Sequence, residues 1–151
     1  MLAVALAALV RPDPQRFVRV EARARVVSLT LVGGYDGSND GFNFDGYSSG
    51  ALLVTVPLHW RVRVTCTNRA PQRSSCAVVQ GAMTARIAFK GASTTQPLEG
   101  LSTGSSEVFS FVPTRVGAFR LVSLVPGDAE ARMWDVLEIV RSGSPSVSVL
   151  R

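Results

Sequence analysis

Apolar and polar residues alternate along much of the chain, and this period of two predicts β-strands. Between Val18 and Val26 a charged residue stands at every odd position, and valine or alanine stands at every even one. Such alternation is typical of strands with one solvated and one buried face. The same pattern recurs in "HWRVRVTCTN", where the residues on one side are Trp60, Val62, Val64 and Cys66.

Turn-forming residues separate the strand-like segments at intervals of about ten residues. Further segments that predict strands are 50–57, 76–80, 106–113, 117–127 and 133–142. No internal repeat and no long linker divides the 151 residues. The pattern therefore predicts one all-β domain, a sandwich of seven to eight strands. Residues 81–105 are the least regular part, and either a short helix or an excursion beside the sheet is expected there.

The first ten residues form an apolar run that ends at Arg11. Ten residues are too few to span a bilayer, which needs about 20, and the run lacks the basic start of a secretory signal. We assign residues 1–15 to an apolar segment with a Pro-rich linker, and residues 16–151 to the folded domain. The run is either a retained targeting remnant or a contact with a partner or a membrane interface, and we favour the contact. Its large side chains are Leu2, Val4, Leu6 and Leu9.

The formal net charge is +5, and fifteen arginines stand against a single lysine, Lys90. This arginine excess reflects either genomic base composition or docking on an anionic partner or lipid surface. Because the arginines are scattered and not interleaved with aromatic residues, the sequence argues against nucleic acid as a partner.

Motifs of catalysis are missing, and we expect no enzyme. The sequence has no G-x-S-x-G elbow and no phosphate-binding loop. His59 is its only histidine, which excludes a His-rich metal site. The loop "GGYDGSNDG" carries carboxylates and glycines but lacks the spacing of an EF-hand, so we interpret it as a polar loop.

Three separated segments together resemble a known family. They are "FNFDGYSSGALLVTVPLHWRVRVTCTN", "NRAPQRSSCAVV" and "GAFRLVSLVPGDAEARMWDVLEIV". In this order they resemble the sulfocyanin-like branch of the blue copper proteins, the cupredoxins, over about residues 26–140. That branch has an FNFNG-type segment before a strand, a short loop with the first histidine ligand, and a ligand loop with a V-P-G turn and a closing Met-Trp. The resemblance implies a cupredoxin-like Greek-key β-sandwich.

The resemblance also places the copper-ligand positions, and most of them hold residues that are poor copper ligands. The cysteine position falls on Ser123, the second histidine on Asp128 and the axial methionine on Met133. The first histidine position falls on Ser75, or on its neighbour Cys76, since the loop length leaves the alignment uncertain by one. A blue copper site needs a thiolate, two imidazoles and a weak axial thioether. We therefore expect no bound copper and no other cofactor.

Cys66 and Cys76 are the only cysteines. In a fold typical of exported proteins, which the resemblance implies, they are expected to form a disulfide that closes a loop of about ten residues and contributes up to ~3 kcal/mol. The alternative is two buried free thiols, because both lie beside apolar strand positions. Metal binding by Cys76 together with Asp128 and Met133 is a remote third hypothesis.

The leading hypothesis is a non-catalytic, copper-free accessory subunit of a bacterial membrane electron-transfer assembly, photosynthetic or respiratory. It would lie in the periplasm or on the outer face of the inner membrane, contact subunits of a membrane protein complex, and touch the membrane peripherally through residues 1–10. One alternative is a soluble electron-transfer or metal-binding protein with an altered copper site, and another is a free-standing binding module. The arginines expected to contact an acidic partner are Arg115, Arg120 and Arg132.

Overall fold

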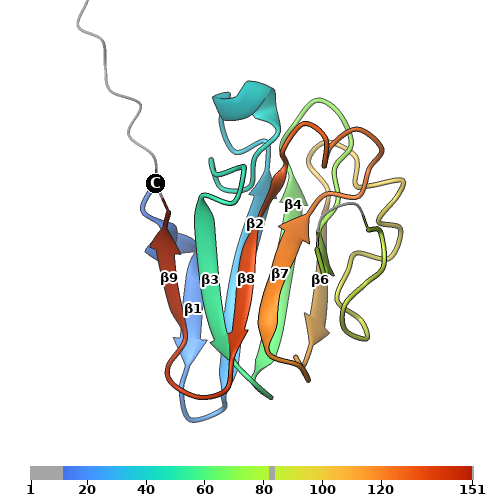
Figure 1. The fold of residues 1–151 in the computed structure, drawn as a ribbon. Coiled ribbons are helices and arrows are strands. Elements are labelled where there is room, and N and C mark those ends of the chain that lie inside the picture. Colours follow the sequence, from blue (N-terminus) through green and yellow to red (C-terminus); the bar gives the residue numbers. More distant parts are fainter. Residues whose placement is uncertain (1–11, 82–83, 151) are drawn as a thin grey trace, which may run out of the picture.

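A computed structural model of the chain describes residues 12–81 and 84–150 and forms a sandwich of two β-sheets (Figure 1). The strands are β1 (Val18–Glu21), β2 (Val26–Gly33), β3 (Leu52–Pro57), β4 (Arg61–Asn68), β5 (Ala77–Val79), β6 (Ser106–Phe111), β7 (Gly117–Val122), β8 (Trp134–Val140) and β9 (Ser146–Val149). Two short 3₁₀ turns, η1 (Pro14–Phe17) and η2 (Ser38–Gly41), complete the regular structure of these residues. The predicted all-β sandwich is confirmed.

The strand order brings the chain's long loops together at one end. One sheet has the order β1-β2-β4-β6 and the other β5-β7-β8-β3-β9. β2 runs parallel to β4, β3 runs parallel to β8, and β7 is antiparallel to β8. The segments that follow β2, β4 and β7 and that precede β3, β5 and β8 therefore meet (Figure 1). We call this the loop end; it comprises residues 33–51, 68–76 and 123–133.

The alternation in the sequence decides which side chains fill the core between the sheets. Val62, Val64 and Cys66 of β4 are buried as expected, and Trp60 is partly buried against the same core. The arginines between them on β4 are exposed. Burying one face of each strand supplies the main favourable free energy of such a fold.

Two features of the fold depart from the sequence pattern, and a third decides between the two expectations for the irregular segment. The alternation across residues 18–26 is interrupted by a turn, in which Arg25 has φ 53° and its N–H donates to the Ala22 carbonyl at 3.2 Å. β9 was not among the expected strands, and its antiparallel pairing with β3 completes the second sheet. Residues 84–105 contain no helix and instead run beside β5, which Ile87 and Ser93 contact through isolated bridges.

Hydrogen bonds fix the segment that precedes β1. The Tyr47 hydroxyl donates a hydrogen bond to the Pro12 carbonyl at 2.6 Å, and the Asp13 carboxylate accepts one from the Gln15 N–H at 3.0 Å at the start of η1. Within the described ranges, no helix is long and apolar enough to cross a bilayer.

Candidate functional site

The loop between β7 and β8 is closed by its own backbone. The Ser123 N–H donates to the Met133 carbonyl at 3.3 Å, and the Met133 N–H donates to the Asp128 carbonyl at 3.0 Å. Gly127 has φ 94°, a left-handed conformation that favours glycine, and so allows the turn. These contacts bring Ser123, Asp128 and Met133 together at the loop end, with each of the three side chains buried.

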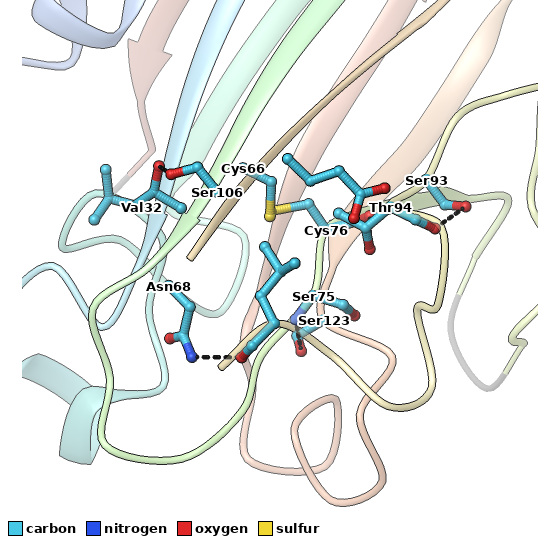
Figure 2. Close-up of a disulfide and its surroundings, with 12 residues drawn as sticks. Val32, Cys66, Asn68, Ser75, Cys76, Ser93, Thr94, Ser106 and Ser123 are labelled. Carbon is cyan, nitrogen blue, oxygen red and sulfur yellow. Dashed lines mark hydrogen bonds between the residues drawn. A yellow bond between two sulfur atoms is a disulfide. The ribbon is translucent and has the colours of Figure 1, made fainter. Parts of the chain in front are cut away.

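Hydrogen bonds connect this loop to the segment before β5. The Ser123 hydroxyl donates to Asp128 Oδ2 at 2.7 Å and accepts from the Ser75 N–H at 3.0 Å. The Ser75 hydroxyl in turn accepts from the Leu124 N–H at 3.0 Å. Figure 2 shows Ser75 beside Ser123, close to the disulfide at Cys76. The two hydroxyls therefore brace two loops against each other.

Ser74 also belongs to this site, although the sequence analysis did not single it out. A Cβ added to Gly33 on β2 would lie 2.6 Å from Ser74 Oγ and 3.1 Å from Met133 Cε. Ser74 and Met133 thus converge on one point, whereas the Ser75 hydroxyl faces Leu124. The sequence carries no signal that distinguishes Ser74 from Ser75, because residues 74–79 are buried at every position and show no alternation.

Burial raises the pKa of Asp128 above its ordinary value of 3.8. The negative charge of Glu130 raises this pKa further, while the hydrogen bond from Ser123 lowers it. Removing a carboxylate from water disfavours its charged form. The pairing with Ser123 is therefore the contact that supports an ionised Asp128 in this position.

A disulfide joins Cys66, at the end of β4, to Cys76, just before β5, with a Cα–Cα distance of 6.0 Å. Both sulfurs lie in the core, since the two residues are at most 1% exposed. Because the sequence has only these two cysteines, the bond leaves no thiolate for a metal at the loop end.

His59 lies at the opposite end of the sandwich from Met133. It follows β3, whereas Met133 precedes the parallel strand β8. The His59 N–H donates to the Pro113 carbonyl at 3.0 Å. A blue copper centre needs one thiolate and two imidazoles, and the site offers the hydroxyls of Ser74, Ser75 and Ser123, the carboxylate of Asp128 and the thioether of Met133. The residues do not fit such a centre. The described ranges also hold no group of three or more His, Cys, Asp or Glu side chains that could bind a metal.

The candidate interface residues have different surroundings. The Arg115 guanidinium packs 5.0 Å from the Phe89 ring centre and donates to the Ala88 carbonyl at 3.1 Å. These contacts within the chain fix the side chain, although the residue is exposed. The Arg120 guanidinium stacks 3.6 Å from the Trp134 ring centre. Arg132 is exposed at the loop end. The apolar candidates Leu2, Val4, Leu6 and Leu9 lie outside the described residues.

A second buried carboxyl group, Asp45, lies in the "FNFDG" segment. Its Oδ1 accepts from the Val32 N–H at 2.8 Å, and its own N–H donates to the Val32 carbonyl at 2.9 Å. Oδ2 is buried and has no hydrogen-bond partner in the described part of the chain. Burial raises the pKa of Asp45 to about 8, although the Val32 hydrogen bond acts in the opposite direction.

The two sheets and the closed loop after β7 define the class of protein: a cupredoxin, the β-sandwich of the blue copper proteins. The sequence matches the family model described as "Sulfocyanin (SoxE) domain" over residues 14–149, and the chain belongs to this family. The predicted family is therefore confirmed. Among curated protein sequences, none matches significantly.

Solved cupredoxins share the fold at low sequence identity. Auracyanin from Roseiflexus castenholzii is 18% identical, with a TM-score of 0.56. The structural match covers 75% of this chain and 96% of auracyanin. Rusticyanin from Thiobacillus ferrooxidans is also 18% identical, with a TM-score of 0.54 over 84% of this chain and 89% of rusticyanin. Blue copper oxidase from Nitrosomonas europaea is 16% identical, with a TM-score of 0.59 over 78% of this chain and 39% of the oxidase. The shared fold thus occurs in small blue copper proteins and in an oxidase.

Proposed function

We propose that this protein is a non-catalytic, copper-free cupredoxin that serves as an accessory subunit of a bacterial membrane electron-transfer assembly. One observation carries the proposal: the hydrogen bonds among Ser75, Ser123 and Asp128 occupy the loops in which the family holds its metal. The fold is kept, and its ligand loop is stabilised by polar contacts within the protein.

The chemistry of these groups supports the absence of copper. A neutral hydroxyl is a poor substitute for a thiolate, and an aspartate with a thioether does not replace two imidazoles. The Ser123 hydroxyl already donates to Asp128 and accepts from Ser75. A metal would have to break both bonds and leave buried polar groups unpaired, which costs about 1–3 kcal/mol for each group.

A hollow beside the ligand loop supports a docking role. It has a volume of about 280 Å³, and its apolar walls include Val79, Val122 and Leu124. Arg120 and Glu130 also line it. An apolar centre with charged residues around it is the arrangement that protein interfaces use. A partner subunit would place an apolar side chain in this hollow and an acidic group beside Arg120.

The disulfide supports a location outside the cytoplasm. Disulfides persist in oxidising compartments such as the periplasm and are rare in the cytosol. The bond between Cys66 and Cys76 therefore favours the periplasmic face of the inner membrane. At that face the subunit would meet the complexes that carry electrons.

The test is recovery of the tagged full-length chain from gently solubilised native membranes, with mass spectrometry of co-purifying proteins and metal analysis of the same sample. The expected result is stoichiometric recovery within a haem- or pigment-containing complex, with no copper assigned to this chain. A monomer without redox partners would contradict the subunit role, and stoichiometric copper on the monomer would favour an electron carrier.

Two matched variants locate the contact. Leu124→Glu places a charge in the hollow, whereas Val108→Glu places one at an exposed position of β6 in the other sheet. We expect the Leu124 variant to lose the complex and the Val108 variant to keep it. Equal recovery of both variants would exclude the hollow as the docking site.

A further inference from the structure

Five exposed arginines gather on the outer side of the β1-β2-β4-β6 sheet and on the turn between β1 and β2. Figure 1 shows the four strands and this turn. We call this surface the arginine face; it consists of Arg19, Arg23, Arg25, Arg61 and Arg63. In the sequence these residues fall into two groups that are more than thirty positions apart, so the charge pattern alone did not reveal them as one patch.

The strand register assembles the patch. Arg19 of β1 pairs with Ser28 of β2, and Ser28 pairs with Arg63 of β4. Neighbouring strands lie about 4.8 Å apart, so the backbones of the two arginines are roughly 10 Å from each other, with only Ser28 between them. At the end of the strands the Arg61 N–H donates to the Arg25 carbonyl at 3.0 Å, which places the β1–β2 turn beside β4.

Little negative charge balances this face. Glu21 of β1 is its one acidic residue, and it approaches Arg19 with an Nε–Oε1 distance of 3.9 Å, the single ion pair of the described ranges. Both side chains of that pair are largely exposed, so the contact contributes little. Among the residues that the structure describes, no carboxylate lies within salt-bridge distance of the other four guanidinium groups. The face therefore keeps a strong positive potential near the protein surface.

The neighbours of the arginines favour phosphate groups over a protein partner. The outward positions beside them on β2, β4 and β6 hold hydroxyl residues, namely Ser28, Thr30, Thr65, Thr67, Ser106 and Ser110. No aromatic residue faces outward from these strands, and Val108 is the large apolar side chain exposed there. Protein interfaces are usually centred on buried aromatic or apolar anchors, whereas a guanidinium group binds phosphate oxygens through two parallel hydrogen bonds.

We propose that the arginine face docks this domain onto an anionic lipid bilayer, with the guanidinium groups on the lipid phosphates. The compartment favours lipid over nucleic acid, because the disulfide belongs to an oxidising space that borders membranes. The inference does not depend on the protein complex proposed above, since the arginine face and the hollow beside the ligand loop lie on different sheets.

The test is co-sedimentation of the full-length chain with vesicles of phosphatidylcholine alone and with vesicles of phosphatidylcholine and phosphatidylglycerol in equal parts. Neutral vesicles report any binding by the apolar residues 1–10, and the difference between the two vesicle types reports the charge-dependent part. We expect the chain to prefer the anionic vesicles, and we expect about 0.5 M salt to remove this preference because it screens surface charges.

A variant of the arginine face and a charge-matched control then locate the contact. Arg19→Gln, Arg61→Gln and Arg63→Gln combined remove three charges from the face. The control removes three exposed arginines elsewhere, through Arg73→Gln, Arg86→Gln and Arg132→Gln. Each arginine at a lipid surface contributes about fivefold in affinity, so the face variant should lose about 100-fold. The control should lose less than about tenfold, because its arginines do not touch the bilayer.

Several outcomes would overturn the proposal. Equal losses in the two triple variants would mean that net charge and not this face drives binding. Equal binding to neutral and anionic vesicles would also exclude it. Loss of the native membrane complex by the face variant, without any vesicle binding by the wild-type chain, would assign the face to an acidic protein. Unchanged thermal unfolding of both variants confirms that each is folded.

Discussion

At the scale of one residue, the contacts of Ser123 show how the loop between β7 and β8 is stabilised. The Ser123 hydroxyl connects Asp128 to the Ser75 backbone, and all three residues are buried. Ser123→Ala would leave the carboxylate and the N–H of Ser75 without this partner. We expect the free energy of unfolding to fall by about 1–3 kcal/mol, measured by urea denaturation. Ser142→Ala, at an exposed turn position, is the control and should stay within about 0.5 kcal/mol of the wild type.

Ser74 leads to a sharper test of the ligand positions. Because Ser74 and Met133 approach the same point near Gly33, we expect the variant Ser74→His, Ser123→Cys, Asp128→His to bind copper. Together with Met133 it would supply the donor set of a blue copper site. The measurement is titration with Cu(II), followed by the intense visible absorption of a copper–thiolate bond.

The matched variant carries Ser75→His in place of Ser74→His. The Ser75 side chain faces the Leu124 N–H, and its replacement would also remove that brace. We expect this variant to lack the visible band. If it bound copper as well as the first variant did, Ser75 would be the first histidine position, as the sequence alignment suggested.

Motif spacing and burial explain which site residues the sequence could predict. Ser123, Asp128 and Met133 were found from their positions within one continuous loop, and the structure brings them together. Ser74 depends on how a separate loop of variable length meets Gly33, which spacing alone does not determine. The unusual state of Asp45 likewise comes from burial that only the folded chain creates.

Individual strands were predictable because their alternation extends over several residues. β4, for example, buries Val62, Val64 and Cys66 as its pattern predicted. The turn at residues 22–25 was not found, because arginine and alanine continue the alternation through it, although Arg25 takes a left-handed conformation there. β9 was also missed, because its alternation of serine and valine extends over only four residues, fewer than in the segments that predicted the other strands.

The disulfide connects two elements, and its removal should weaken the loop end as a unit. It closes a loop of ten residues between β4 and β5. We expect Cys66→Ala with Cys76→Ala to lower the free energy of unfolding by about 2–3 kcal/mol, measured by urea denaturation. The double variant should also show faster amide hydrogen exchange at residues 74–76, since the segment loses its covalent connection to β4.

The wild-type protein in a reducing agent is the control for that comparison. Both cysteines are buried, so a mild reductant should leave the native protein unchanged and should act once denaturant opens the sandwich. Rapid reduction without denaturant would show that the loop end opens on its own, and it would contradict the tight packing described above.

At the scale of the whole molecule, Asp45 makes stability depend on pH. The folded-state pKa of about 8 exceeds the ordinary value of 3.8, so between these values the folded protein binds a proton that the unfolded chain releases. The free energy of unfolding therefore falls as pH rises from about 4 to 8. At about 1.4 kcal/mol per pKa unit, we expect a loss on the order of 5 kcal/mol across this window, measured by urea denaturation at a series of pH values.

Asp45→Asn should remove most of this dependence, because an amide keeps the oxygen that accepts from Val32 and does not ionise. Asparagine also tolerates the left-handed conformation of this residue, φ 57°. The variant should resemble the wild type near pH 4 and be more stable at pH 8. Asp40→Asn, an exposed residue with φ 55°, is the control and should keep the wild-type profile. If the Asp45 variant kept that profile too, the dependence would come from another group, with Asp128 the first to examine because its pKa is raised in the same direction.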